Sequence, residues 1–243
     1  MTEHTPQDGI LQLEELIHAG LHKYIDPASR AAQVGWGAFF TVVHQIRAVL
    51  TLHRDRVCFS AGPNRRTIVE YILFLAWLAD DGESVVDVLN RSLQNEQKHM
   101  ATRLSGASLL DQFPEHARQV LAETIATPLA PHPDERLLKP SHLIEEYDST
   151  LKSYYAAESR FSHVSLTSIQ FFLKTEDEAI RLTQMPVPEE PISCPEFCLH
   201  TLSQALLVFN ELLLDHPWTA ELARIAEDYG LDTRRPTRKS NTA

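Results

Sequence analysis

The stretch RRTIVEYILFLAWLA, from Arg65 to Ala79, decides the fold of this chain. Its apolar residues recur at helical spacing and cover two opposite sides of the predicted helix. One side carries Leu73, Phe74 and Trp77, and the other carries Ile68, Ile72 and Leu75. Since a helix that is apolar on both sides must be covered by other elements, we expect this helix at the centre of a helical bundle.

Apolar spacing with the helical period recurs along most of the 243-residue chain, whereas the alternation typical of strands is hard to find. Only 8 residues are glycine, and most of them lie at the ends of segments. We predict helices over residues 9–25, 28–56, 64–79 and 84–104, a helix kinked or restarted by Pro114 that reaches residue 127, one bent helix or two helices over 141–182, a helix from Ser193 and a short helix over 218–229. The predicted fold class is therefore all-α, a single multi-helix bundle of about eight helices.

Proline-rich connections separate these helices. The longest, over residues 128–140, is where two sub-bundles would divide. We prefer one domain over residues 1–230, because the apolar stretch Tyr154–Leu173 has to be covered by other helices. After a second connector, Ser193 and Glu196 have the spacing of a capping box. Residues 231–243 include the basic run RRPTRK and are expected to form a flexible tail, with docking to an acidic partner as the alternative.

Composition limits the function classes. The net charge of −11 disfavours nucleic-acid binding, which usually needs a basic face. The longest apolar run, YILFLAWLA, is far shorter than the ~20 residues that span a bilayer. The chain has three cysteines, an odd number, and its polar opening lacks the apolar core of a secretory leader. We therefore expect a soluble, cytoplasmic protein with no membrane partner.

The first polar feature is Glu70, which stands inside the apolar central helix. An unpaired carboxylate in that interior would be costly, and Arg66, one turn earlier, is its natural partner. Three interpretations follow: a buried ion pair that determines helix register, a carboxylate that lines a polar pocket, or a pair that is exposed at the surface. If the pair is buried, Glu70→Ala should destabilise the protein by a few kcal/mol.

The second polar feature is the cluster ESRFSH, Glu158 to His163. On a helical wheel Tyr155, Ser159 and His163 point together into the interior, whereas Arg160 turns to a polar edge. A catalytic Ser–His pair is disfavoured, because a helix interior offers neither a strained nucleophile elbow nor an oxyanion hole. A hydrogen-bonded core histidine and a ligand-pocket histidine remain as the two alternatives.

Two sets of residues have the chemistry of metal ligands. Glu96 and His99, with Glu70 on the preceding helix, imitate half of a ferritin-like di-metal site. Cys194, Cys198 and His200 lie close in sequence, but their spacing is not that of a zinc knuckle and a fourth ligand is not evident. No nucleotide-binding or hydrolase motif is present. The sequence therefore predicts no cofactor and no metal, with Glu96 and His99 as weak candidates.

The combination of RRTIVEYILFLAWL with a later YYAAESRFSH resembles an uncharacterised family of helical bacterial proteins that is frequent in actinobacteria. The shared patterns are R-x-x-x-E, here Arg66 and Glu70, and Y-x-x-x-S-x-x-x-H, here Tyr155, Ser159 and His163. The resemblance implies that the two clusters form one constellation. HEPN-type helical ribonucleases offer a more distant similarity, because they use an arginine followed by a histidine. Here the gap between Arg160 and His163 is shorter than in that pattern.

Three functional hypotheses result. The leading one is a non-enzymatic or regulatory bundle whose buried polar constellation forms a small ligand pocket. The alternative is a HEPN-like RNA-acting protein of a defence or toxin system, and a weaker one is a metal-dependent oxidase. Whether the protein is an enzyme is left open. The partner is expected to be an unknown small molecule or protein, and self-association also stays open.

Overall fold

The computed structural model describes residues 5–107, 109, 112–129, 132–162, 169–170, 172–176, 179–183 and 193–239. The predicted all-α class is confirmed, since helices dominate and the strands are few and short. The longer helices are α1 (Pro6–His18), α2 (Arg30–Arg54), α3 (Gly62–Asp81), α4 (Glu83–Gly106), α5 (Glu115–Ala126), α6 (Pro140–Glu146), α7 (Leu151–Ser162), α9 (Cys194–Asn210) and α10 (Thr219–Tyr229). Short 3₁₀ helices are η1 (Leu21–Tyr24), η2 (Cys58–Ala61) and η4 (Pro133–Leu138).

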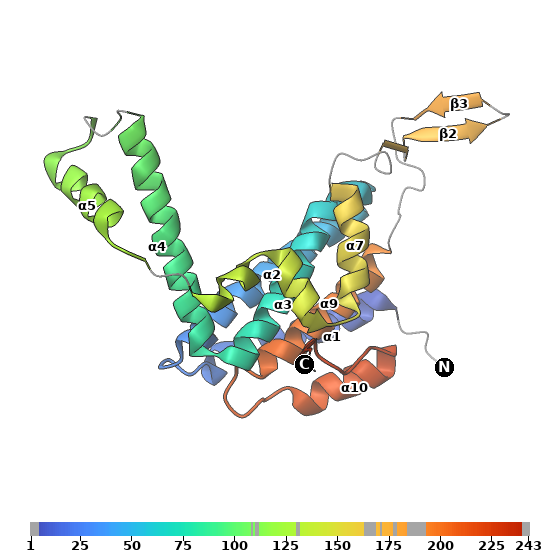
Figure 1. Ribbon diagram of the computed structural model, residues 1–243. Helices are drawn as coiled ribbons and strands as arrows, with labels where there is room; N and C mark the ends of the chain where they lie inside the picture. The colour runs from blue at the N-terminus through green and yellow to red at the C-terminus, as the bar shows by residue number, and fades with distance from the viewer. Residues whose placement is uncertain are drawn as a thin grey trace.

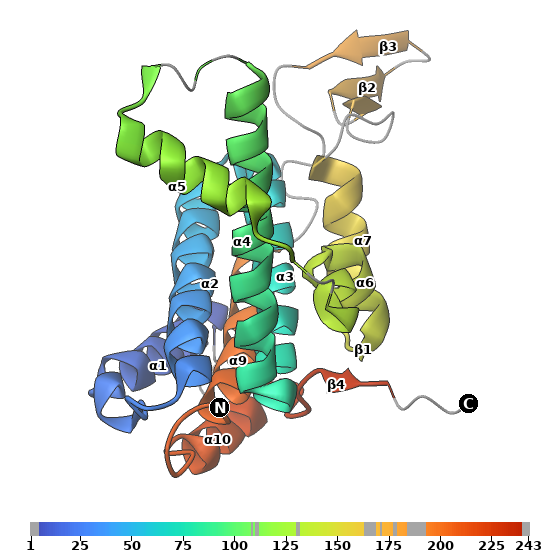
Figure 2. The same cartoon turned by 60° about the vertical axis from the view of Figure 1, so that its left-hand side comes forward.

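The predicted central helix is at the centre. Helix α3 packs against α2, α7 and α9, and Figure 1 shows these helices gathered in the body of the molecule. Helix α9 is buried along nearly its whole length and is seen between α2 and α4 in Figure 2. Phe39 of α2 stacks on Phe209 of α9 with ring centroids 4.4 Å apart. The two-sided apolar pattern therefore corresponds to a helix covered on more than one side.

Local signals explain several helix ends. Thr5 and Asp8 form a capping box that starts α1, and Ser29 caps α2 by accepting a hydrogen bond from the Ala32 amide. Gly230 ends α10 in the left-handed conformation, as its position after the last apolar residue predicts. The helix predicted to start at Ser193 is confirmed, since Ser193 is the N-cap of α9, but its side chain makes no capping hydrogen bond.

Helices α4 and α5 form an arm that projects from the body (Figure 1). The buried residues of α4 lie mainly in its first turns, and α5 has no buried residue. Large apolar side chains along the arm are exposed, among them Leu93, Met100 and Val120. Pro114 stands directly before α5, so the predicted restart at this proline is confirmed.

The helix predicted to reach residue 182 is partly wrong. Strands β2 (Leu173–Glu176) and β3 (Ala179–Leu182) form an antiparallel hairpin, with Leu173 opposite Leu182 and Thr175 opposite Ile180. Lys174 and Glu176 alternate with Leu173 and Thr175, and Arg181 separates Ile180 from Leu182, which is a strand pattern. That short pattern is hidden next to a longer apolar helical stretch, and single-sequence reasoning extended the helix through it.

The described residues 231–239 of the basic tail contact the body, and the flexibility predicted for residues 231–243 stays a prediction. Strand β4 (Thr237–Arg238) pairs with β1 (Tyr147–Asp148), and the carboxylates of Asp80, Asp81, Glu146 and Glu211 pair with Arg235 and Arg238. We call residues 231–239 the C-terminal strap. Two arginines of the basic run therefore pair with carboxylates of the same chain.

The connector over residues 128–140 is part of the body where it is described. Its helix η4 packs on α4 and α6, and Leu137 is buried in the shared hydrophobic core. Among the described residues, no helix combines the length and apolar character that a bilayer span requires.

Candidate functional site

The predicted pair of Arg66 and Glu70 forms on α3, with Arg66 Nε 2.9 Å from Glu70 Oε1. Its burial is overestimated by the sequence: the side chains are 25% and 23% exposed. Burial acts to lower the pKa of the Arg66 guanidinium, but its hydrogen bond to Glu70 and its contact with Tyr155 outweigh this effect and raise the pKa overall. The pair therefore lies at a partly open edge of the core.

Tyr155 of the second predicted cluster contacts Arg66 of this pair. The guanidinium carbon of Arg66 lies 5.0 Å from the centroid of the Tyr155 ring, a cation–π contact between α3 and α7. Ser159 is half-buried, and its Oγ has no hydrogen-bond partner among the described residues. Arg160 is exposed, as the helical wheel predicts. His163 lies outside the described residues, so its convergence with Glu70, and the HEPN-like hypothesis that uses it, stay predictions.

A groove of about 570 Å³ opens on the Glu70 side of α3. Its walls come from α2, α3, α4, η4 and α6, and most are apolar: Val34, Gly37, Ala38, Thr41, Glu70, Tyr71, Phe74, Leu89, Leu137, Leu138, Pro140 and Leu143. Glu70 is the single charged group among these lining residues. A Cβ atom added to Gly37 would meet nothing within 4 Å, so the groove is open above this glycine.

Sequence reasoning missed a fully buried ion pair between α3 and α7. Its members, Arg65 and Glu158, directly precede the predicted residues Arg66 and Ser159. Arg65 Nε donates to Glu158 Oε1 at 2.7 Å, and both side chains are 0% exposed. Burial raises the pKa of the Glu158 carboxyl despite the Arg65 hydrogen bond. The signal was present, because Arg65 shares its helical face with Val69, Ile72 and Ala76, all of which are buried.

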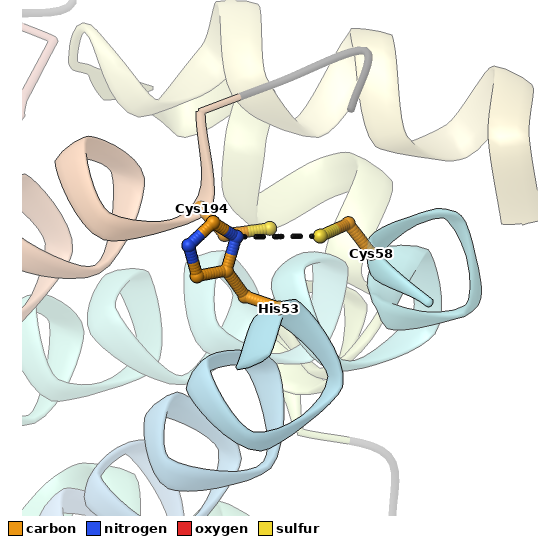
Figure 3. Close-up of side chains that lie close together, drawn as sticks. All are labelled: His53, Cys58 and Cys194. Carbon is orange, nitrogen blue, oxygen red and sulfur yellow. Dashed lines mark hydrogen bonds between the residues drawn. The ribbon is translucent and has the colours of Figure 1, made fainter. Parts of the chain in front are cut away.

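Two cysteines and a histidine meet, as Figure 3 shows, and Arg65 donates hydrogen bonds to both cysteines. His53 comes from the end of α2, Cys58 from η2 and Cys194 from the start of α9. Their ligand atoms all lie within 4.8 Å of one another, and Cys58 Sγ is 3.4 Å from His53 Nδ1. Arg65 Nη1 donates to Cys194 Sγ at 3.3 Å and to the Cys58 carbonyl at 3.0 Å. We call His53, Cys58 and Cys194 the thiol–imidazole cluster.

Cys198 and His200, which lie close to Cys194 in sequence, are not part of the thiol–imidazole cluster. Cys198 is buried one turn further along α9, with its sulfur 4.0 Å from the Ile46 carbonyl, and burial raises the pKa of its thiol. His200 contacts Thr150 and Tyr154, and burial lowers its pKa. The structure therefore pairs Cys194 with Cys58, a partner from a distant part of the chain.

The ferritin-like half site does not assemble in the described part of the chain. Glu96 and His99 are exposed on the projecting half of α4, and Glu70 lies in the groove of the body. The group of potential metal ligands found among the described residues is the thiol–imidazole cluster, which contains none of these three side chains.

Comparisons with known proteins add no assignment. The chain matches no protein-family model, no curated protein and no solved structure. The functional argument therefore depends on the geometry of the groove and of the cluster.

Proposed function

We propose that this protein is a non-enzymatic binding protein that holds a small amphipathic molecule in the groove around Glu70. The observation that supports the proposal is an apolar groove with one carboxylate on its wall. Its volume of about 570 Å³ lies within the range of about 300–1,000 Å³ typical of small-molecule sites. The odd number of cysteines, three, fits a reducing compartment, so cytoplasmic action is part of the proposal.

The walls would select the body of the ligand. Leu89 from α4, Leu137 and Leu138 from η4, and Phe74 from α3 present hydrocarbon to the groove from different elements. Burial of apolar surface contributes about 25 cal/mol per Å² without demanding a particular orientation. A short alkyl or aromatic body would satisfy these walls.

The carboxylate would select one end of the ligand. Arg66 donates to Oε1 of Glu70, but a carboxylate accepts several hydrogen bonds, so a ligand donor can approach from the groove. An amine or a hydroxyl group meets this requirement, whereas a carboxylate on the ligand would be repelled. The expected ligand is therefore an apolar molecule with a single hydrogen-bond donor at one end.

The neutral fluorophore N-phenyl-1-naphthylamine tests for the groove, and three eight-carbon competitors test its polar end. We expect saturable binding of the dye and displacement by octylamine and 1-octanol more readily than by octanoate. Glu70→Gln should remove the advantage of octylamine over octanoate. Displacement by octanoate as readily as by octylamine would contradict the assignment of Glu70.

Gly37→Leu should fill the groove and weaken dye binding at least tenfold, because the added side chain enters open space in the binding site. Gly106→Leu is the matched control: its added Cβ also meets nothing within 4 Å, but Gly106 lies at the end of α4, outside the groove. Equal dye affinity in both variants would show that the groove is not the binding site.

A further inference from the structure

The thiol–imidazole cluster, which Arg65 contacts, has the composition of a metal site. Cysteine sulfur and histidine nitrogen are the ligands that Zn²⁺ prefers in proteins. Zn–S and Zn–N bonds of about 2.3 and 2.0 Å at a tetrahedral angle place a sulfur and a nitrogen about 3.5 Å apart. The 3.4 Å between Cys58 Sγ and His53 Nδ1 agrees with that separation.

We propose that His53, Cys58 and Cys194 bind one Zn²⁺ ion, with a water molecule or a small ligand as the fourth ligand. Both sulfurs are buried, whereas His53 is half-buried, so the histidine side is the approach from solvent. Each thiol gives up its proton as the metal binds, and the bound species is a dithiolate with a neutral imidazole. This inference goes beyond the proposed function and does not depend on the groove.

Charge balance favours a divalent ion. Two thiolates and one Zn²⁺ sum to zero, and the adjacent Arg65–Glu158 pair also sums to zero. A buried site with no net charge avoids the heavy cost of an uncompensated charge in the interior. A monovalent ion such as Cu⁺ would leave one negative charge among buried side chains.

The surroundings are built like the outer shell of a metal site. Arg65 donates to Cys194 Sγ through Nη1 and to Glu158 Oε1 through Nε. Hydrogen bonds to ligand atoms orient them and tune the metal.

Zinc content of the reduced full-length protein, loaded with ZnCl₂ and freed of excess metal by gel filtration, tests the proposal. We expect one zinc per chain in the wild type. Cys58→Ser and Cys194→Ser should lose zinc on the column, because each should bind it at least about tenfold more weakly, roughly the loss that even outer-shell changes produce. Cys198→Ala is the matched control, because Cys198 is a buried cysteine of the same helix as Cys194 but lies outside the cluster. It should retain full zinc.

Cobalt substitution in the wild type keeps the test decisive if a serine variant does not fold. Co²⁺ at the cluster should give the near-ultraviolet charge-transfer band of thiolate ligation, and added Zn²⁺ should abolish it. The proposal is overturned if wild type binds no zinc, or if Cys58→Ser and Cys194→Ser retain it. It is equally overturned if thiol titration of unreduced protein shows Cys58 and Cys194 joined as a disulfide that zinc and reductant do not replace.

Discussion

At the scale of single residues, two ion pairs in adjacent positions of α3 have different roles. Arg66–Glu70 is a local pair one turn apart at a partly open edge, whereas Arg65–Glu158 joins α3 to α7 with both side chains fully buried. An exposed pair contributes little to stability. A buried pair need not stabilise the fold relative to an apolar pair, but the loss of one partner leaves a charge in the core.

The two glutamates therefore give a matched comparison. Glu158→Ala should lower the free energy of unfolding by about 3–5 kcal/mol, because it leaves Arg65 unpaired in the core. Glu70→Ala should cost about 1 kcal/mol or less, since solvent reaches both members of its pair. Urea denaturation followed by circular dichroism measures both values, and equal costs would contradict the difference in burial. The destabilisation of a few kcal/mol that the sequence predicts for Glu70→Ala is thus expected for Glu158→Ala instead.

At the scale of elements, helix α2 carries two glycines in opposite environments. A Cβ atom added to Gly35 would lie 2.6 Å from Leu212 Cδ1 and 3.4 Å from Leu78 Cδ2, whereas one added to Gly37 would meet nothing. Gly35 thus allows the close approach of α2 to the chain after α9. Gly37 leaves room in the groove.

Alanine at these positions should shift stability in opposite directions. Gly37→Ala should raise the free energy of unfolding by about 0.5–1 kcal/mol, because alanine loses less backbone freedom in a helix. Gly35→Ala should lower it by about 1 kcal/mol, as the crowding of Leu212 outweighs the same gain. Thermal unfolding of the two variants beside wild type separates the effects. A stabilised Gly35→Ala protein would show that α2 can move away at little cost.

The contact of the C-terminal strap with the rest of the protein should depend on pH. The hydrogen bond from Arg238 lowers the pKa of the Glu146 carboxyl, and Arg136 adds to this effect. A carboxyl whose pKa is lower in the folded state adds stability above its ordinary pKa of about 4.3 and loses it as the pH falls through the folded value. Acid should therefore weaken the strap.

Arg238→Ala should reduce the free energy of unfolding by about 1 kcal/mol at pH 7, allowing for solvent screening. The difference from wild type should shrink as the pH falls below about 4.3, where Glu146 becomes protonated. Arg234→Ala is the control in the same segment, because the Arg234 side chain is 83% exposed and pairs with Asp232 two residues earlier. A difference that is constant with pH would contradict the role of Glu146.

At the scale of the whole molecule, stability should be unevenly distributed. Helices α3 and α9 lie in the hydrophobic core, whereas α5 has no buried residue and packs on α4 in the projecting arm (Figure 1). Regions with few buried apolar contacts open locally at low free energy. The arm can therefore open while the body stays folded.

Hydrogen exchange measures this difference directly. We expect amides of α5 to exchange at least tenfold faster than those in the middle of α3 and α9, because α5 can unfold without exposing the core. The first turns of α4, which hold the buried Val85, Val86 and Val88, should exchange as slowly as the body. Uniform protection across α4 and α5 would show that the arm is covered in solution by an apolar contact.

The sequence by itself determined the helical fold class, the central position of the 65–79 helix and most helix boundaries. These properties depend on spacing within one segment, which a single sequence records directly. It also identified Glu70 and Tyr155, because the side chains on one helical face follow from spacing alone. The β2–β3 hairpin was missed because four-residue strands give a weak periodic signal.

Only the tertiary structure decided which distant residues meet. Arg65 and Glu158 are 93 positions apart, and Arg65 and Cys194 are 129 apart, so no local pattern connects them. The sequence grouped Cys194 with Cys198 and His200 because they are near in the chain, but packing turns Cys194 towards His53 and Cys58. Such a meeting depends on how α2, α3, α7 and α9 rotate and pack against one another, which is a property of the assembled core and of no single helix.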